Sequence, residues 1–247
     1  MNKIKSVLRL AISIALAFTF SCSSDDGGDN SGGGSDGPCP NVVTGDGTMS
    51  CGGQKYKTVV IGSQTWMAEN LNYNAKGSVC YDKKESNCKK YGRLYDWATA
   101  MGIDKKYNEE EWGESDVNHQ GICPSGWHIF SYDDWNVLMK TVDPNCDGYY
   151  ECAVAPELKA KEGWDPYTGD NADVPVPSTD EFEFSALPGG YYDVEFGRIG
   201  LTGRWFSSTE YDSNNAGHMV MRHKYYSVFF SYDGGKNSLF SVRCVKD

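Results

Sequence analysis

Residues 123–144, CPSGWHIFSYDDWNVLMKTVDP, carry the clearest secondary-structure signal of the chain. Within this segment, Ser131 is followed three residues later by Asp134, which is the spacing of a capping box at a helix start. Pro144 marks the end of the helix, because proline cannot continue one. Between these limits the apolar residues recur with the period of a buried helix face, at Trp135, Leu138, Met139 and Val142. We therefore expect an amphipathic helix here.

Other segments indicate a mixed α+β chain without tandem repeats. A second helix face is predicted by Leu94, Trp97, Ala98 and Met101, and a short helix is predicted around residues 156–161. Residues 182–187 lead into a Pro-Gly-Gly turn at 188–190. The dipeptide Asp233-Gly234, which follows residues 219–231, is typical of a hairpin turn. Runs rich in β-branched and aromatic residues predict strands, at 56–61, 205–209, 219–231 and 240–245.

The first 21 residues have the pattern of a secretory signal peptide. Lys3, Lys5 and Arg9 accompany an apolar run over residues 8–20 that is too short to span a bilayer comfortably. The run ends in Thr-Phe-Ser-Cys, which resembles a bacterial lipobox, so Cys22 is expected to be diacylated and to become the first mature residue. An ordinary signal peptide cut nearby is the alternative. Both interpretations predict export.

Residues 22–38 form an expected flexible, acidic linker between the lipid and a globular domain over residues 39–247. The stretch SSDDGGDNSGGGSDG contains no large apolar residue and cannot bury enough surface to order itself. Its acidic start is similar to tags that route lipoproteins to the outer face of the outer membrane. We therefore expect an exported protein, lipid-anchored to the outer membrane, at the cell surface.

The charge of the chain is acidic, with a formal net charge of −11. Removal of the leader takes away three basic residues and no acidic ones, so the mature chain is near −14. An acidic chain lacks the basic footprint that nucleic acid requires. It also disfavours wide contact with anionic head groups, which leaves the acyl chains as the expected membrane contact.

The nine cysteines are an odd number for an oxidising compartment. Assigning Cys22 to the lipid leaves eight, which can pair in about 105 ways. No two matched CxxC pairs are present, and this disfavours a zinc site. Proximity in sequence suggests three local pairs and leaves two cysteines over. The local pairs are Cys39 with Cys51, Cys80 with Cys88 and Cys146 with Cys152, and the remaining cysteines are Cys123 and Cys244.

Several strings occur in a fixed order: TWMAENLNY (65–73), YGRLYDW (91–97), CPSGWHI (123–129), FSALPGGY (184–191), SSTE (207–210) and SVRCVKD (241–247). Together they resemble the Fibrobacter succinogenes major paralogous domain, a family of exported bacterial domains. The resemblance runs from about Tyr56 to Asp247. Phe130 stands where the family usually has proline and Glu183 where glycine is usual, and both departures affect loop geometry more than chemistry.

The family resembles C-type-lectin-like domains, including the formylglycine-generating enzymes. This resemblance implies an α+β, C-type-lectin-like fold with two helices, a small twisted antiparallel sheet and long loops, stapled by disulfides. It also implies a disulfide from the region before a helix to the last strand, which suits Cys123 with Cys244. It implies no established activity, so function is argued from the residues.

The sequence contains no catalytic constellation. His119, His128, His218 and His223 fit no HExxH or other metal spacing, and there is no GxSxG elbow or P-loop. Formylglycine-generating relatives use a redox pair of cysteines, which Cys146 and Cys152 imitate. In an exported chain with an even cysteine set, a structural disulfide is the favoured interpretation. We therefore expect a protein that is not an enzyme.

Aromatic residues favour a binding function, because the chain has seven Trp, sixteen Tyr and ten Phe. Aromatic faces stack on sugar rings while neighbouring polar groups bind hydroxyls. Core burial is the alternative for each aromatic, and we expect it for Trp97, Trp127 and Trp135. The candidate ligand-binding residues lie in or beside expected long loops: Trp164, Tyr167, Tyr191, Tyr192 and Trp205.

Residues 165–180 include a candidate calcium site. Calcium prefers hard oxygen ligands, and lectin relatives often hold it in a long loop. The spacing matches no EF-hand, and an acidic loop that is only solvated is the alternative. The candidate ligands are Asp165, Asp170, Asn171, Asp173 and Asp180. No other cofactor is expected.

These observations favour a non-enzymatic cell-surface lipoprotein that binds carbohydrate or polysaccharide. A protein-binding module for adhesion or assembly, using the same loops, is the first alternative. An oxidoreductase akin to the formylglycine-generating group is the second. The leading hypothesis predicts glycan binding, the first alternative a specific protein neighbour, and the second a free thiol.

Overall fold

The computed structural model describes residues 34–35, 37–43, 47–114, 118–146, 151–166 and 176–247. The leader and Cys22 lie outside these ranges, so the expectations for them stay predictions. Among the described residues, no helix has the length and apolarity needed to cross a bilayer. The strands are β1 Asn41–Val43, β2 Thr48–Cys51, β3 Gln54–Ile61, β4 Gln64–Met67, β5 Trp127–Ile129, β6 Glu151–Cys152, β7 Gly189–Tyr192, β8 Phe196–Ile199, β9 Thr202–Glu210, β10 Asn215–Arg222, β11 Val228–Gly235 and β12 Cys244–Lys246. The helices are α1 Glu85–Tyr91, α2 Trp97–Met101, α3 Tyr132–Val142 and α4 Ala155–Leu158, with 3₁₀ turns η1 Tyr81–Lys83 and η2 Lys105–Asn108.

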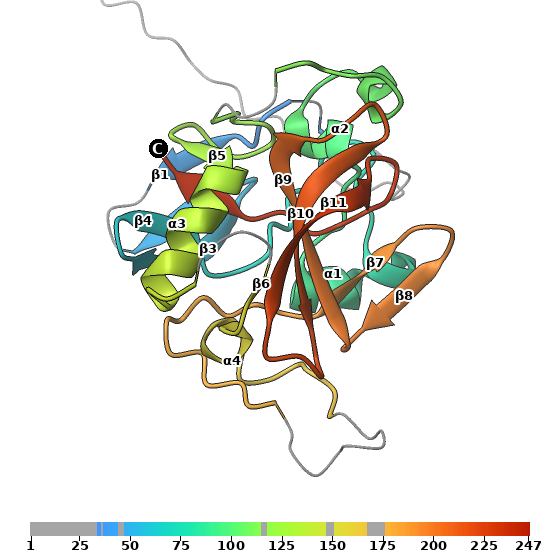
Figure 1. Cartoon of the computed structure of the whole chain (residues 1–247). Helices are drawn as coiled ribbons and strands as arrows, with labels where there is room; N and C mark the ends of the chain where they lie inside the picture. The colour runs from blue at the N-terminus through green and yellow to red at the C-terminus, as the bar shows by residue number, and fades with distance from the viewer. Residues whose placement is uncertain (1–33, 36, 44–46, 115–117, 147–150, 167–175) are drawn as a thin grey trace, which may run out of the picture. The chain divides into compact units, whose positions relative to one another are not determined.

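The first sheet is antiparallel and has the order β1-β2-β3-β4-β12-β5. The last strand, β12, lies inside it, because Val245 pairs with both Trp66 of β4 and His128 of β5. The helix α3 lies against β3 and β4 (Figure 1) and buries its apolar face in one cluster with Ile61 and Trp66. The strands that pair here are far apart in the sequence, so this sheet joins the N-terminal and C-terminal parts of the domain.

The second sheet has the order β6-β11-β10-β9-β7-β8. Its strands pair in antiparallel fashion except at β7 and β9, which make a parallel contact between Gly190 and Gly203. β7 and β8 form a hairpin at one end (Figure 1). With few helices and mainly antiparallel, curled sheets, the chain has the α+β class that the sequence predicts.

The helix α3 confirms the reading of residues 123–144. Ser131 Oγ accepts a hydrogen bond from the Asp134 backbone N–H at 3.2 Å, and Asp134 Oδ2 accepts one from the Ser131 N–H at 2.8 Å. Trp135, Leu138 and Met139 are fully buried and Val142 is half-buried. The two reciprocal bonds satisfy orphan donors at the helix start, which is how a capping box fixes where a helix begins.

Three expected elements have different limits from those predicted. α2 begins after Asp96, whose Oδ1 accepts from the Thr99 N–H at 3.0 Å, so Leu94 lies outside the helix and bridges Val79 instead. α4 ends at Leu158, because Ala160 N–H bonds across to Ala186 O. The last strand covers only 244–246, and the residues before it form single bridges to other segments.

The hairpin turn predicted at Asp233-Gly234 is wrong, because both residues lie within β11 and Gly234 pairs with Ala216 of β10. A Cβ on Gly234 would lie 2.6 Å from His218 Nδ1, so glycine serves a close strand approach beside the register shift between β10 and β11 rather than a turn. The chain instead reverses between Arg222 and Val228, within the segment predicted as one strand. Gly189 and Gly190 likewise start β7 directly after Pro188.

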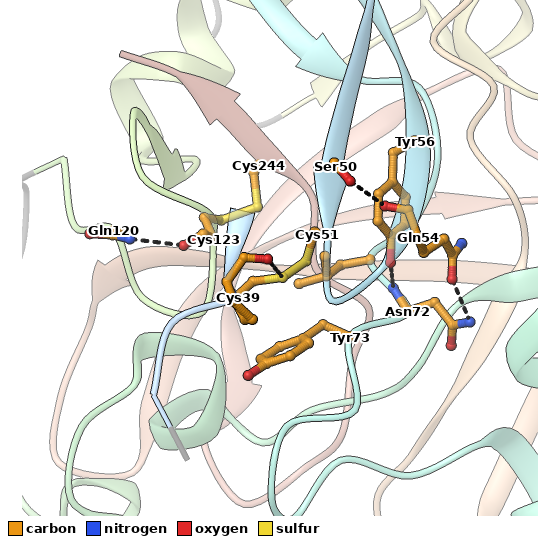
Figure 2. Close-up of a disulfide and its surroundings, with 12 residues drawn as sticks. Cys39, Ser50, Cys51, Gln54, Tyr56, Asn72, Tyr73, Gln120, Cys123 and Cys244 are labelled. Atoms are coloured by element: carbon orange, nitrogen blue, oxygen red, sulfur yellow. Dashed lines mark hydrogen bonds between the residues drawn. A yellow bond between two sulfur atoms is a disulfide. The ribbon is translucent and has the colours of Figure 1, made fainter. Parts of the chain in front are cut away.

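All eight described cysteines are in disulfides, in the pairing that proximity suggests: Cys39–Cys51, Cys80–Cys88, Cys123–Cys244 and Cys146–Cys152. The Cys123–Cys244 bond joins the segment before α3 to β12, as the family resemblance implies. Figure 2 shows it in one view with Cys39–Cys51, and the Cys39 N–H bonds to Ile122 O at 3.1 Å. Beside this pair, Tyr56 Oη accepts from the Asn72 N–H at 3.0 Å (Figure 2).

A buried polar cluster connects the strings that carry the family resemblance. Asn70 Oδ1 accepts from Trp205 Nε1 at 2.8 Å and from Arg243 Nε at 3.0 Å. The Arg243 guanidinium also donates to the backbone carbonyls of Met67, Phe184 and Ser185. Arg243 is fully buried, and a buried charge requires this full set of partners. The strings are therefore explained by folding.

His128 connects the capping box to the last residue of the chain. Its Nδ1 lies 2.7 Å from Asp247 Oδ1 and its Nε2 lies 3.2 Å from Asp134 Oδ2. Burial disfavours the imidazolium, but hydrogen bonds to these two carboxylates outweigh burial and raise the pKa of His128. A raised histidine pKa stabilises the fold below the unfolded-state pKa, and that stability is lost as pH rises through the folded-state pKa.

We expect the free energy of unfolding to fall as pH rises from about 6.5, the unperturbed histidine pKa, because His128 loses its proton in the folded state. In His128→Gln this part of the pH dependence disappears, and stability at pH 6 falls by about 1 kcal/mol. Urea unfolding at several pH values measures both effects. Equal pH slopes in the two proteins would contradict the assignment.

Candidate functional site

The structure separates the five aromatic candidates. Trp205 is fully buried and offers no ring face to a ligand. Trp164 is half-buried, with Nε1 donating to Ala186 O at 3.0 Å and Lys159 Nζ over its ring at 4.9 Å. Tyr192 packs edge-on against Phe196 of β8. Tyr191 lines a pocket, and Tyr167 lies outside the described residues.

The pocket at Tyr191 has a volume of about 820 Å³, within the usual range of ligand-binding clefts. Hereafter it is called the Tyr191 pocket. Its walls come from β7, β8, β9, the end of β10, the segment between β10 and β11, and residues 165–166. Besides Tyr191, an exposed aromatic ring lies in the wall, that of Tyr225. Its basic lining residues are Arg198, Arg204, Arg222, His223 and Lys224.

The Tyr191 pocket is basic although the chain is acidic. Among the described residues, no carboxylate lies within ion-pair distance of Arg198, Arg204 or Arg222. One acidic residue, Asp165, lines the wall, and its backbone carbonyl lies 3.3 Å from His223 Nδ1. The lining therefore concentrates positive charge, and the three arginines have no carboxylate ion-pair partner among the residues that the structure describes.

Arg204 is the best-positioned of these cations. Its guanidinium lies 4.4 Å from the ring centroid of Tyr191 and 5.3 Å from that of Phe240, so the two rings fix its plane. Its Nε is buried and donates to no acceptor. Burial lowers the pKa of Arg204, and the charge of Arg222 adds to this effect, while Tyr191 and Asp233 partly oppose it. An arginine held in this way has donors ready for an external acceptor.

A smaller hollow of about 190 Å³ adjoins the Tyr191 pocket and shares Arg204 and Arg222 with it. His218 of β10 lines this hollow, is fully buried, and makes no hydrogen bond through either ring nitrogen. Asp233 Oδ1 lies 3.8 Å from its Nε2, beyond hydrogen-bond distance. Burial, with the nearby charge of Arg204, lowers the pKa of His218 to about 3. The ring is thus neutral, and its polar atoms are unsatisfied.

The turn that carries Arg222, Lys224 and Tyr225 is held from below by Lys159. Its Nζ donates to the backbone carbonyls of Arg222 at 2.9 Å, Tyr225 at 3.1 Å and His223 at 3.3 Å. Burial lowers the pKa of Lys159 to about 8. The turn contains no glycine or proline. Lys159 therefore supplies the hydrogen-bond donors for the turn carbonyls, a role that typical turn residues normally fill locally.

The candidate calcium ligands are only partly visible. Asp180 accepts from the Ser185 N–H and Oγ, both at 2.7 Å, so both of its carboxylate oxygens already have protein partners. Asp165 lies in the wall of the Tyr191 pocket. Asp170, Asn171 and Asp173 fall outside the described residues. The calcium expectation stays a prediction.

Comparison with known families covers most of the folded domain, from within β3 to β12. Residues 59–246 match the Fibrobacter succinogenes major domain. The chain belongs to this family. Comparisons with curated proteins and with solved structures give no match. In this Fibrobacter succinogenes major domain, the recurring strings supply the buried cluster and the Cys123–Cys244 bond. Of the residues that line the Tyr191 pocket, those strings include Tyr191 alone. Family membership therefore leaves the ligand of the pocket open.

The basic residues of the site were not singled out in the sequence. The run MRHKYY, residues 221–226, combines three basic side chains with two tyrosines in an otherwise acidic chain. A basic run beside two tyrosines, in an otherwise acidic chain, is the sequence signal that indicates Arg222, His223, Lys224 and Tyr225 as site residues. Arg198 and Arg204 carry no such signal, because each is a single cation within a strand.

Proposed function

We propose that this protein is a non-enzymatic binding module, lipid-anchored at the cell surface, that holds a polysaccharide in the Tyr191 pocket. The observation that carries the proposal is the placement of Tyr191 and Tyr225 in one pocket with arginine donors. Sugar recognition needs aromatic faces for the apolar side of the ring and fixed donors for its oxygens. The Tyr191 pocket supplies both on a scaffold held by four disulfides.

We also propose that the fold is a variant of the C-type-lectin-like domain. Support comes from the disulfide between the segment before α3 and the last strand, and from a chain whose first and last strands share one sheet. In this arrangement the loops of the second sheet are free to carry a ligand site. A solved structure of the domain, compared with lectin-like folds strand by strand, tests this assignment.

Binding to polysaccharides is tested with the full-length chain in detergent, by affinity electrophoresis through gels that contain neutral and acidic polysaccharides. We expect retardation by at least one polymer. Tyr225→Ala removes an exposed ring from the pocket and is expected to weaken that binding about tenfold. Tyr211→Ala is the matched control, because Tyr211 is 63% exposed and does not line the pocket. No retardation by any polymer would reject the function and favour a protein partner.

The anchor makes a separate prediction. In cells, Cys22→Ser is expected to shift the protein from the membrane fraction to the soluble fraction, because two acyl chains are what hold an acidic domain at a bilayer. Mass spectrometry of the wild-type protein should find acyl groups on Cys22 as the first residue. Membrane retention of Cys22→Ser would show that another segment anchors the chain.

A further inference from the structure

The paired arginines of the Tyr191 pocket constrain the ligand further. In the ladder between β9 and β10, Arg204 pairs with Val220, and Arg222 follows Val220 by two positions. Residues two apart in a strand share a face, so Arg204 and Arg222 are diagonal neighbours on one face of the sheet. Like charges at this spacing repel each other. A protein of net charge −11 has many carboxylates, yet no described one pairs with either arginine.

Unsatisfied donors and acceptors point to the same place. The Nε of Arg204 and both ring nitrogens of His218 are buried without hydrogen-bond partners. Both residues line the smaller hollow, and Arg204 also lines the Tyr191 pocket. Leaving buried polar groups without hydrogen-bond partners is unfavourable. A ligand that carries charged oxygens would satisfy the arginine donors and relieve the repulsion between the two guanidinium groups.

We infer that the ligand is an acidic polysaccharide, whose uronate carboxylates or sulfate esters bind between Arg204 and Arg222 while a sugar ring lies against Tyr225. This inference rests on the proposed function and names its substrate class. Arginine binds carboxylate and sulfate oxygens through two parallel hydrogen bonds. A neutral sugar would add no negative charge between the two guanidinium groups, which have no described carboxylate within ion-pair distance. The charge of the pocket therefore selects acidic polymers over neutral ones.

The test compares each acidic polymer with its own neutral form, again with the full-length chain in detergent. Polygalacturonate is set against its fully methyl-esterified form, and dextran sulfate against dextran. We expect at least tenfold tighter binding to one acidic polymer than to its neutral form, and weaker binding as salt rises. The arm that responds identifies carboxylate or sulfate as the anion. Equal binding to acidic and neutral forms would overturn the inference while leaving the polysaccharide function standing.

Arginine variants locate the binding. Arg222→Gln, at an exposed side chain, and Arg204→Gln are each expected to weaken binding to the acidic polymer about tenfold, with little change toward the neutral one. Lys55→Gln is the matched control, because it removes an exposed charge on β3 away from the pocket. Thermal unfolding of each variant verifies folding. If Lys55→Gln weakens binding as much as Arg222→Gln, the pocket assignment fails.

Discussion

Arg243→Met is expected to lower the free energy of unfolding by about 4 kcal/mol, enough to unfold a large fraction of a marginally stable domain. The Arg243 guanidinium donates to Asn70 Oδ1 and to the carbonyls of Met67, Phe184 and Ser185. Methionine fills similar volume but donates no hydrogen bond, so the three carbonyls lose the arginine donors while Asn70 Oδ1 keeps only Trp205 Nε1. Each buried acceptor left unsatisfied costs about 1 to 3 kcal/mol. Equilibrium unfolding in urea measures the change.

Arg222→Met is the matched control, because Arg222 is exposed and its side chain donates no hydrogen bond to any residue that the structure describes. Surface substitutions of this kind stay within about 0.5 kcal/mol of wild type. Asn70→Ala provides a second check, since it removes the acceptor shared by Arg243 and Trp205. If Arg243→Met were no less stable than Arg222→Met, the buried cluster would not contribute to the stability of the fold as expected.

Local chemistry made part of this fold predictable. The capping box at Ser131 and the apolar face at Trp135 act within one helix, so sequence spacing alone locates α3. The three short-range disulfides follow from proximity, because closing a short loop needs little chain ordering. Trp97, Trp127 and Trp135 are in the core as expected. The α+β class came from the alternation of such signals together with the family resemblance.

Long-range contacts account for what sequence did not predict. The Asp-Gly dipeptide that ends at Gly234 is typical of a turn, but the close packing of Gly234 against His218 places it in a strand. The reversal after Arg222 lacks turn residues, because Lys159, distant in sequence, holds its carbonyls. Trp205 was a ligand-binding candidate because it lies beside expected long loops, but its hydrogen bond to Asn70 and its core neighbours bury it. Each of these partners is too far away in the sequence for the local periodicity of apolar residues to reveal it.

The candidate site follows the same division. Tyr191 was proposed from its place in or beside an expected long loop, and it lines the pocket. The arginines were missed because alternation along a strand hides which face a single cation occupies until strand register is fixed. Register places Arg204 and Arg222 on one face of β9 and β10. The positive charge of the site is thus a property of strand pairing.

Removing the Cys123–Cys244 bond is expected to cost about 5 kcal/mol in the chain-entropy model, because it closes a loop with a sequence separation of 121. Both sulfurs are fully buried, so the double variant Cys123→Ala/Cys244→Ala keeps apolar groups in the core and leaves no free thiol. The bond also ties β12, an interior strand of the first sheet, to the segment that leads into β5 and α3. Loosening it releases the strand that carries Arg243's neighbour Cys244, so the buried cluster weakens as well.

The matched control is Cys80→Ala/Cys88→Ala, whose bond has a separation of 8 and is expected to contribute only about 2.5 kcal/mol. Thermal and urea unfolding of both double variants, each without free thiols at the altered pair, give the difference directly. A larger loss for the short loop than for the long one would mean that strain or denatured-state structure, rather than loop length, sets the contribution. The expected order follows because a long loop restricts the unfolded chain far more than a short one, while each folded bond spans a similar Cα–Cα distance, 5.9 Å against 5.0 Å.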